Sequence, residues 1–227
     1  MEDNQEIQMD GRDEKEDRVG ETVYRYSSSW IYKLETEEHW RLYWRQQKLM
    51  EGLVKPGQRV LEIGHGTGFT ANYLRTKGVQ VTTIDIDPEK KPDIIANIVT
   101  YDFIDQYDHI LGFEVFEHIP FIEFQKLLNK LSAVCCGYLF LSVPHNERKW
   151  FHITVELPKL GRFSYTFKTF RGKITQPHHF WEADHGPATY QVLLNSFMQA
   201  GFTIQRKDKF QSLLFFALKA PEKIPTL

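Results

Sequence analysis

From residue 37 onward, the apolar positions of the chain switch repeatedly between helical spacing and short continuous runs. Residues 37–53, EEHWRLYWRQQKLMEGL, carry apolar and aromatic side chains at helical spacing and stop before the turn signal Pro56-Gly57. Residues 59–63, RVLEI, are typical of a short buried strand. Residues 67–78, TGFTANYLRTKG, then predict a helix that is closed by Gly78.

The rest of the chain continues this alternation. Four further runs are typical of strands, namely residues 79–87, 92–98, 108–113 and 137–143. A helix is expected from near Pro120 through Cys136, and residues 201–219 predict a terminal hairpin. Alternating strands and helices indicate a parallel sheet with both faces covered. We therefore expect an α/β fold with a doubly wound, mostly parallel seven-stranded sheet and a C-terminal antiparallel hairpin.

Composition and charge narrow the class of protein. The chain has 227 residues, 41% of them apolar, which suffices for one substantial core. No apolar run approaches the roughly 20 residues that span a bilayer, and the polar N-terminus does not resemble a secretory signal. We expect a cytoplasmic protein without a membrane span, with a disordered acidic tail over residues 1–20 and one domain over 21–227.

The chain has two cysteines, Cys135 and Cys136, which are adjacent in an apolar stretch. Buried thiols are expected here rather than a disulfide or a metal site. Redox chemistry is therefore not indicated.

The stretch LEIGHGTGF, residues 61–69, contains three glycines after a predicted strand. A dinucleotide fingerprint would need glycine at position 69, but Phe69 stands there and the spacing is G-x-G-x-G. Glu62, two residues before Gly64, would repel a pyrophosphate but could anchor a cationic ligand. S-adenosylmethionine carries an ammonium and a sulfonium group and no phosphate.

With these features the chain resembles the class I S-adenosylmethionine-dependent methyltransferases over about residues 38–220. LEIGHGTGF is similar to their first motif, TTIDID to their second, and GFEVFEHIP to their fourth strand and the following turn. The resemblance implies a Rossmann-like fold, in which the glycine loop lies along the methionine part of the cofactor and Asp85 receives the ribose hydroxyls. The cofactor-binding residues that it implies are Glu62, Gly64, His65, Gly66, Gly68, Asp85, Ile86, Asn97, Ile98 and Glu114.

Asn97 departs from the family pattern. At the end of the third strand the family commonly has an aspartate that bonds the adenine amino group, and an amide oxygen could accept the same bond. Asp102 is the alternative.

The stretch EVFEH, residues 114–118, places Glu114, Glu117 and His118 where one helical turn would gather them. Such a set could bind Mg²⁺ or Mn²⁺. The motif resembles that of ubiquinone-pathway O-methyltransferases and of small-RNA 2′-O-methyltransferases, in which it supplies metal ligands, and His178 or His179 could stand in for the later histidine of the RNA enzymes. In the alternative, which we favour on the sequence, Glu114 contacts cofactor, Glu117 and His118 fix the turn, and no metal is used.

A long connection over about residues 145–187 replaces the short loop expected after the fifth strand. It is rich in aromatic residues, and residues 147–173 carry seven basic and two acidic side chains. These features predict a lid suited to an acidic or planar substrate, or a small subdomain that covers the sheet. Three histidines near its end, His178, His179 and His185, are candidates for a general base, as is His118.

Together these patterns predict a methyltransferase that acts on a small molecule, with a hydroxyl oxygen as the expected acceptor. Two alternatives are a metal-assisted RNA 2′-O-methyltransferase and a cofactor-binding protein that has lost catalysis. RNA is the less favoured partner because the positive charge is modest and local. The sequence does not identify the acceptor or the oligomeric state.

Overall fold

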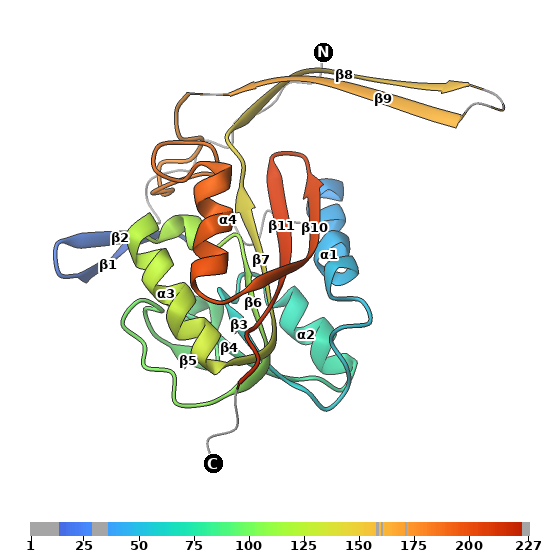
Figure 1. Ribbon diagram of the computed structural model, residues 1–227. Coiled ribbons are helices and arrows are strands. Elements are labelled where there is room, and N and C mark those ends of the chain that lie inside the picture. Colours follow the sequence, from blue (N-terminus) through green and yellow to red (C-terminus); the bar gives the residue numbers. More distant parts are fainter. Residues whose placement is uncertain (1–13, 29–35, 158, 160, 171, 224–227) are drawn as a thin grey trace.

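The computed structural model describes residues 14–28, 36–157, 159, 161–170 and 172–223. A seven-stranded sheet in the order β10-β11-β7-β6-β3-β4-β5 forms its centre (Figure 1). Its strands are β3 (Arg59–Ile63), β4 (Gln80–Asp85), β5 (Ile94–Ile95), β6 (Tyr107–Phe113), β7 (Cys135–Pro144), β10 (Thr203–Phe210) and β11 (Leu213–Lys219). Strands β5, β4, β3, β6 and β7 are parallel, and the C-terminal hairpin adds β11 antiparallel to β7. The predicted fold class is confirmed.

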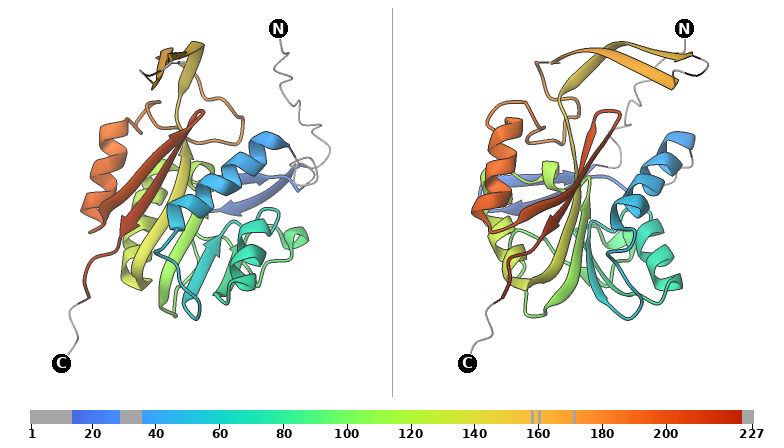
Figure 2. Two further views of the ribbon diagram at one scale, coloured as in Figure 1. Left: turned by 90° about the vertical axis from the view of Figure 1, so that its right-hand side faces the viewer. Right: turned by 45° about the vertical axis from the view of Figure 1, so that its right-hand side comes forward.

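Helices cover both faces of this sheet (Figure 2). They are α1 (Glu37–Met50), α2 (Phe69–Thr76), α3 (Phe121–Val134) and α4 (Tyr190–Gln199). Successive residues of a strand point to opposite faces, so Val60 and Leu111 pack with α1 and α2, whereas Leu61 and Ile110 pack with α3 and α4. This two-sided burial explains why the strands read as continuous apolar runs.

Two predicted boundaries are wrong. Strand β5 has two residues instead of seven, because the Asp93 carboxylate accepts a hydrogen bond from the backbone N–H of Thr83 and so replaces a strand contact. The helix expected to run through Cys136 ends at Val134, and both cysteines belong to β7. Cys135 is buried as expected, but Cys136 is exposed.

A second small sheet lies at the N-terminal side, where strands β1 (Lys15–Val19) and β2 (Thr22–Tyr26) form a hairpin. Lys15 forms ion pairs with Asp87 and Glu89, and Asp17 accepts a hydrogen bond from the Asn97 amide. The expectation of a disordered tail is therefore wrong for residues 15–19, while its first 13 residues lie outside the described part of the chain.

The long connection after β7 forms a third sheet. Strands β8 (Glu147–Leu157) and β9 (Gly161–Phe170) pair as an antiparallel hairpin that stands away from the domain (Figures 1 and 2). The chain then returns to the body, where the fully buried Trp181 donates its indole N–H to the carbonyls of Phe116 and Ile119. These hydrogen bonds hold the segment around Trp181 against the turn that follows β6. None of the helices in the described ranges is long and apolar enough to cross a membrane.

Candidate active site

The glycine loop joins β3 to α2 at the carboxyl edge of the sheet. Gly64 has a φ of 78°, and a Cβ atom at this position would lie 2.3 Å from Cγ2 of Val115. Gly68 has a φ of 74° and precedes the first turn of α2. Both positions therefore require glycine, since other residues rarely adopt this backbone conformation.

A cavity of about 560 Å³ opens beside this loop. This volume lies within the range of small-molecule sites. The cavity is lined by these predicted cofactor residues: Glu62, Gly64, His65, Gly66, Asp85, Ile86, Asn97, Ile98 and Glu114. His118, His178 and His179 line the same cavity, so the glycine loop and the candidate acceptor residues share one space.

Glu62 lies at the floor of the loop and is almost completely buried. Its Oε2 has no hydrogen-bond partner among the described residues, and Nδ1 of His65 lies 3.5 Å from it. Burial raises the pKa of Glu62, and the neighbouring His65 opposes that shift. A buried acceptor without a partner costs stability, so this oxygen fits the ammonium of a ligand such as S-adenosylmethionine.

Asp85 ends β4 and is also buried. Its carboxylate accepts hydrogen bonds from the backbone N–H groups of His65 at 2.8 Å and Asp87 at 2.9 Å. Lys90 lies 3.3 Å from both carboxylate oxygens. The carboxylate is thus held at the cavity wall, but it already has a cationic partner.

We expect Asp85→Asn to weaken S-adenosylmethionine binding by about 1–3 kcal/mol, because the ribose hydroxyls lose a charged acceptor. Calorimetry measures the affinity. Lys90→Met serves as the matched variant, since it removes the other partner of the same carboxylate and leaves the acceptor in place. Equal weakening by both substitutions would show that Asp85 acts only by holding Lys90.

Asn97 and its alternative differ in position. Asn97 lines the cavity, although its Oδ1 accepts a hydrogen bond from the N–H of Val99 and its Nδ2 donates to Asp17. Asp102 is exposed and does not line the cavity. The adenine contact therefore stays a prediction for Asn97, and Asp102 is not placed to make it.

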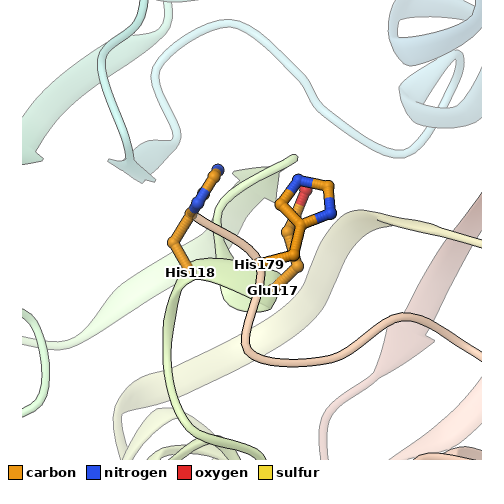
Figure 3. A group of neighbouring side chains, drawn as sticks. All are labelled: Glu117, His118 and His179. Atoms are coloured by element: carbon orange, nitrogen blue, oxygen red, sulfur yellow. The ribbon is translucent and has the colours of Figure 1, made fainter. Parts of the chain in front are cut away.

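Three side chains meet next to the glycine loop. Glu117 and His118 come from the short helix η3 (Phe116–His118), and His179 comes from the connection after β9 (Figure 3). The potential ligand atoms of these residues, hereafter the Glu-His-His trio, all lie within 4.8 Å of one another. Glu114 precedes η3 with a φ of 55°, a strained conformation for a non-glycine residue, and it is not part of the trio.

Hydrogen bonds fix the two imidazoles of the trio. Nδ1 of His118 lies 3.3 Å from the carbonyl of His178, and Nδ1 of His179 lies 3.0 Å from the Glu182 carboxylate. These acceptors place the proton of each ring on Nδ1 and leave Nε2 with a free lone pair. Oε2 of Glu117 is buried and has no hydrogen-bond partner among the described residues. One carboxyl group and two imidazoles are thus held close together, as a cation site requires.

Burial also sets the charges of this region. Burial raises the pKa of Glu114 to about 7 and, together with the nearby Glu114, raises the pKa of Glu117 well above its usual range. Burial and the adjacent His179 lower the pKa of His118 to about 3, so this ring is neutral at pH 7. Burial alone would raise the pKa of Glu182, but hydrogen bonds from His179, Thr175 and Asn146 lower it to about 2.

Not every predicted site residue is brought together. His178 lines the cavity but contributes its backbone carbonyl to the trio. His185 does not line the cavity. The described residues of the β8–β9 hairpin are also absent from the lining, and the aromatic lid stays a prediction. Among the described residues of the long connection, those that line the cavity lie at its end, at Gln176, His178 and His179.

Several residues of the cavity wall are not apparent from the sequence motifs. Tyr24, Arg25 and Tyr26 of β2 line the cavity, as do Tyr43 and Gln46 of α1. The signal for β2 was the alternation in TVYRY, which is typical of a half-buried strand. The missed partner of His179 was Glu182, three residues later, because the sequence does not show that this segment turns back on itself.

Comparison with known proteins supports the fold. The methyltransferase domain family matches residues 37–172, and a search of curated proteins finds no match to the chain. N-methyltransferase NodS from Bradyrhizobium japonicum WM9, solved with S-adenosylhomocysteine, superposes with a TM-score of 0.56 at 15% identity over 86% of this chain and 98% of that one. A putative methyltransferase of Haloferax volcanii, solved with the Trm112 activator, gives a TM-score of 0.58. It is 16% identical in sequence over 86% of this chain and 97% of that one. A Burkholderia thailandensis 1,6-didemethyltoxoflavin-N1-methyltransferase superposes with a TM-score of 0.52. It is 14% identical in sequence over 86% of this chain and 87% of that one.

The fold is that of an α/β enzyme, and a cavity opens beside its glycine loop. The chain belongs to the methyltransferase domain family and is an S-adenosylmethionine-dependent methyltransferase, as its sequence motifs predicted.

Proposed function

We propose that this enzyme transfers the methyl group of S-adenosylmethionine to a hydroxyl oxygen of a small-molecule acceptor. The observation that carries the proposal is the Glu-His-His trio, of which His118 and His179 line the same cavity as the glycine loop. Methyl transfer from a sulfonium is an in-line displacement that mainly requires the acceptor atom to be held against the methyl group. A hydroxyl must also lose its proton, and the trio supplies groups suited to that task.

The donor set of the trio fits a divalent cation. Two imidazoles and one carboxylate suit Mn²⁺ better than Mg²⁺, which prefers oxygen ligands. Glu117, His118 and His179 would hold the ion, and Glu182 would orient His179 as an outer partner. When bound, such an ion polarises a coordinated oxygen and lowers the pKa of its proton. The convergence of three donors supports a metal more strongly than the EVFEH motif did by itself.

The walls of the cavity support a small acceptor. Tyr24, Tyr26 and Tyr43 line the cavity, as does Arg25. Aromatic walls with a few polar groups are typical of sites for planar small molecules. Some of the similar structures are N-methyltransferases, so the oxygen acceptor is part of the proposal. The cytoplasmic location also stays a prediction.

The proposal is tested with cofactor that carries a labelled methyl group. Purified enzyme is incubated with a small-molecule extract and, separately, with total RNA, each with and without added Mn²⁺. We expect label in the small-molecule fraction, as an O-methyl group identified by mass spectrometry of the products. Label on nitrogen, or label in acid-precipitated RNA, would contradict the proposal. Cofactor binding by calorimetry without label in either fraction would indicate a binding protein without catalysis.

A further inference from the structure

The β8–β9 hairpin has one face made largely of apolar side chains. Its register pairs Phe151 with Phe167, Ile153 with Tyr165, and Val155 with Phe163. Because alternate residues of a strand share a face, these six side chains and Leu157 lie on the same side. We call this surface the hairpin face, and it consists of Phe151, Ile153, Val155, Leu157, Phe163, Tyr165 and Phe167.

The hairpin face is exposed along its whole length. Each of its seven side chains has between 42% and 62% of its surface accessible. Figures 1 and 2 show the hairpin standing away from the body of the domain, so the central sheet does not cover it. A contiguous apolar surface of this kind on a folded protein marks an interaction site.

The charge of the same segment restricts the partner. Residues 147–173 carry seven basic and two acidic side chains, although the whole chain has a net charge of −2. Positive charge is therefore concentrated in the segment that bears the hairpin face. The partner should combine an apolar layer with negative charge, as an anionic lipid surface does.

A second copy of the chain fits this surface less well. Two strands of about ten residues present a face of roughly 10 by 33 Å, so two such faces would bury about 700 Å² of footprint. A stable interface typically buries about 1,200–2,000 Å². Two copies would also bring together two segments with the same positive excess, which repel each other.

We propose that the hairpin face docks this enzyme on the surface of an anionic lipid bilayer. The aromatic side chains suit the interfacial layer, where Trp and Tyr concentrate in membrane proteins. In the described part of the chain β8 and β9 pair only with each other, so their outer edges carry unpaired backbone groups. Such edges are not stable in hydrocarbon. The hairpin therefore lies flat at the headgroup boundary and does not span the bilayer.

Vesicle sedimentation of the full chain tests this proposal. Vesicles of phosphatidylcholine alone are compared with vesicles that contain phosphatidylserine, at low salt and in 0.5 M NaCl. We expect at least about tenfold stronger binding to the anionic vesicles and a marked loss at high salt, because salt screens the basic side chains. Equal binding to neutral and anionic vesicles, or no binding to either, would overturn the proposal.

Two matched variants distinguish lipid binding by the hairpin face from nonspecific binding through other exposed apolar side chains. The triple variant Phe151→Ser, Phe163→Ser, Tyr165→Ser should bind anionic vesicles at least about tenfold more weakly. The control Ile104→Ser, Ile122→Ser removes exposed apolar side chains elsewhere and should bind like the wild type. Unchanged S-adenosylmethionine affinity shows that the triple variant is folded. Wild-type binding by the triple variant would contradict the proposal, as would a wild-type dimer that this variant converts to a monomer in sedimentation analysis.

Discussion

Replacing His179 by glutamine is expected to lower kcat by about two to four orders of magnitude, with the S-adenosylmethionine affinity changed by less than about threefold. The imidazole lines the cavity as part of the trio on which the proposed proton removal depends, so its loss should affect the transfer step rather than cofactor binding. Glu117→Gln should behave in the same way. Single-turnover kinetics measure the transfer step, and calorimetry measures the affinity.

The matched control for these variants is His185→Gln, which changes a histidine of the same segment outside the cavity. It should retain wild-type kcat. Glu182→Gln is expected to give an intermediate loss, because it weakens the bond that orients His179 without removing the ring. A wild-type rate for His179→Gln would show that the trio has no part in the reaction.

A chelator distinguishes the two ways in which the trio could act. If the trio holds a cation, EDTA should abolish turnover of the wild type, and Mn²⁺ should restore it more effectively than Mg²⁺. Activity that survives EDTA would instead make a histidine the base. In that case turnover should fall as the pH drops below the pKa of that histidine, since the protonated ring cannot accept a proton.

Gly64→Ala is expected to destabilise the folded chain by about 2–5 kcal/mol and to abolish measurable cofactor binding. A non-glycine residue at a φ of 78° costs roughly 1–2 kcal/mol. The added methyl would lie 2.3 Å from Val115, and such overpacking costs about 1–3 kcal/mol more. Urea unfolding measures the free energy of unfolding, and calorimetry measures the binding.

Two further variants separate the two contributions to this loss of stability, the backbone strain and the contact with Val115. A Cβ atom at Gly66 would meet no atom within 4 Å, so Gly66→Ala should cost only the backbone strain of its φ of 53°. Adding Val115→Ala to Gly64→Ala removes the clashing methyl and should recover part of the stability, which a double-mutant cycle quantifies. Equal costs for Gly64→Ala and Gly66→Ala would show that the contact with Val115 relaxes without strain.

Much of the fold could be predicted because its strands are buried on both sides. Residues 59–63 and 137–143 read as apolar runs for that reason, and the glycine spacing between β3 and α2 identified the cofactor loop. The N-terminal hairpin was missed because its strands are mostly polar and are held by distant partners, as in the contacts of Lys15 with Asp87 and of Asp17 with Asn97. Local composition does not reveal such contacts.

The acceptor site was predicted only as a set of candidates. The sequence offers His178, His179 and His185 within eight residues, and nothing in their spacing selects one of them. The choice depends on the anchoring of Trp181 beneath the turn after β6, which brings His179 to Glu117 and His118. The aromatic residues of the hairpin predicted a lid, but composition alone did not show that the register of β8 and β9 places seven apolar side chains on one exposed face.

Asn146, at the base of the β8–β9 hairpin, connects the hairpin to the Glu-His-His trio. Its amide donates to the Glu182 carboxylate at 2.6 Å and to the carbonyl of Lys173 at 2.8 Å, where the chain leaves the hairpin. Glu182 in turn orients His179. The Asn146 side chain therefore connects both ends of the β8–β9 hairpin to the carboxylate that bonds the His179 imidazole. Two hydrogen bonds thus connect the base of the hairpin to this imidazole. A ligand whose affinity depends on how the hairpin is held would, by thermodynamic reciprocity, shift the hairpin by the same free energy.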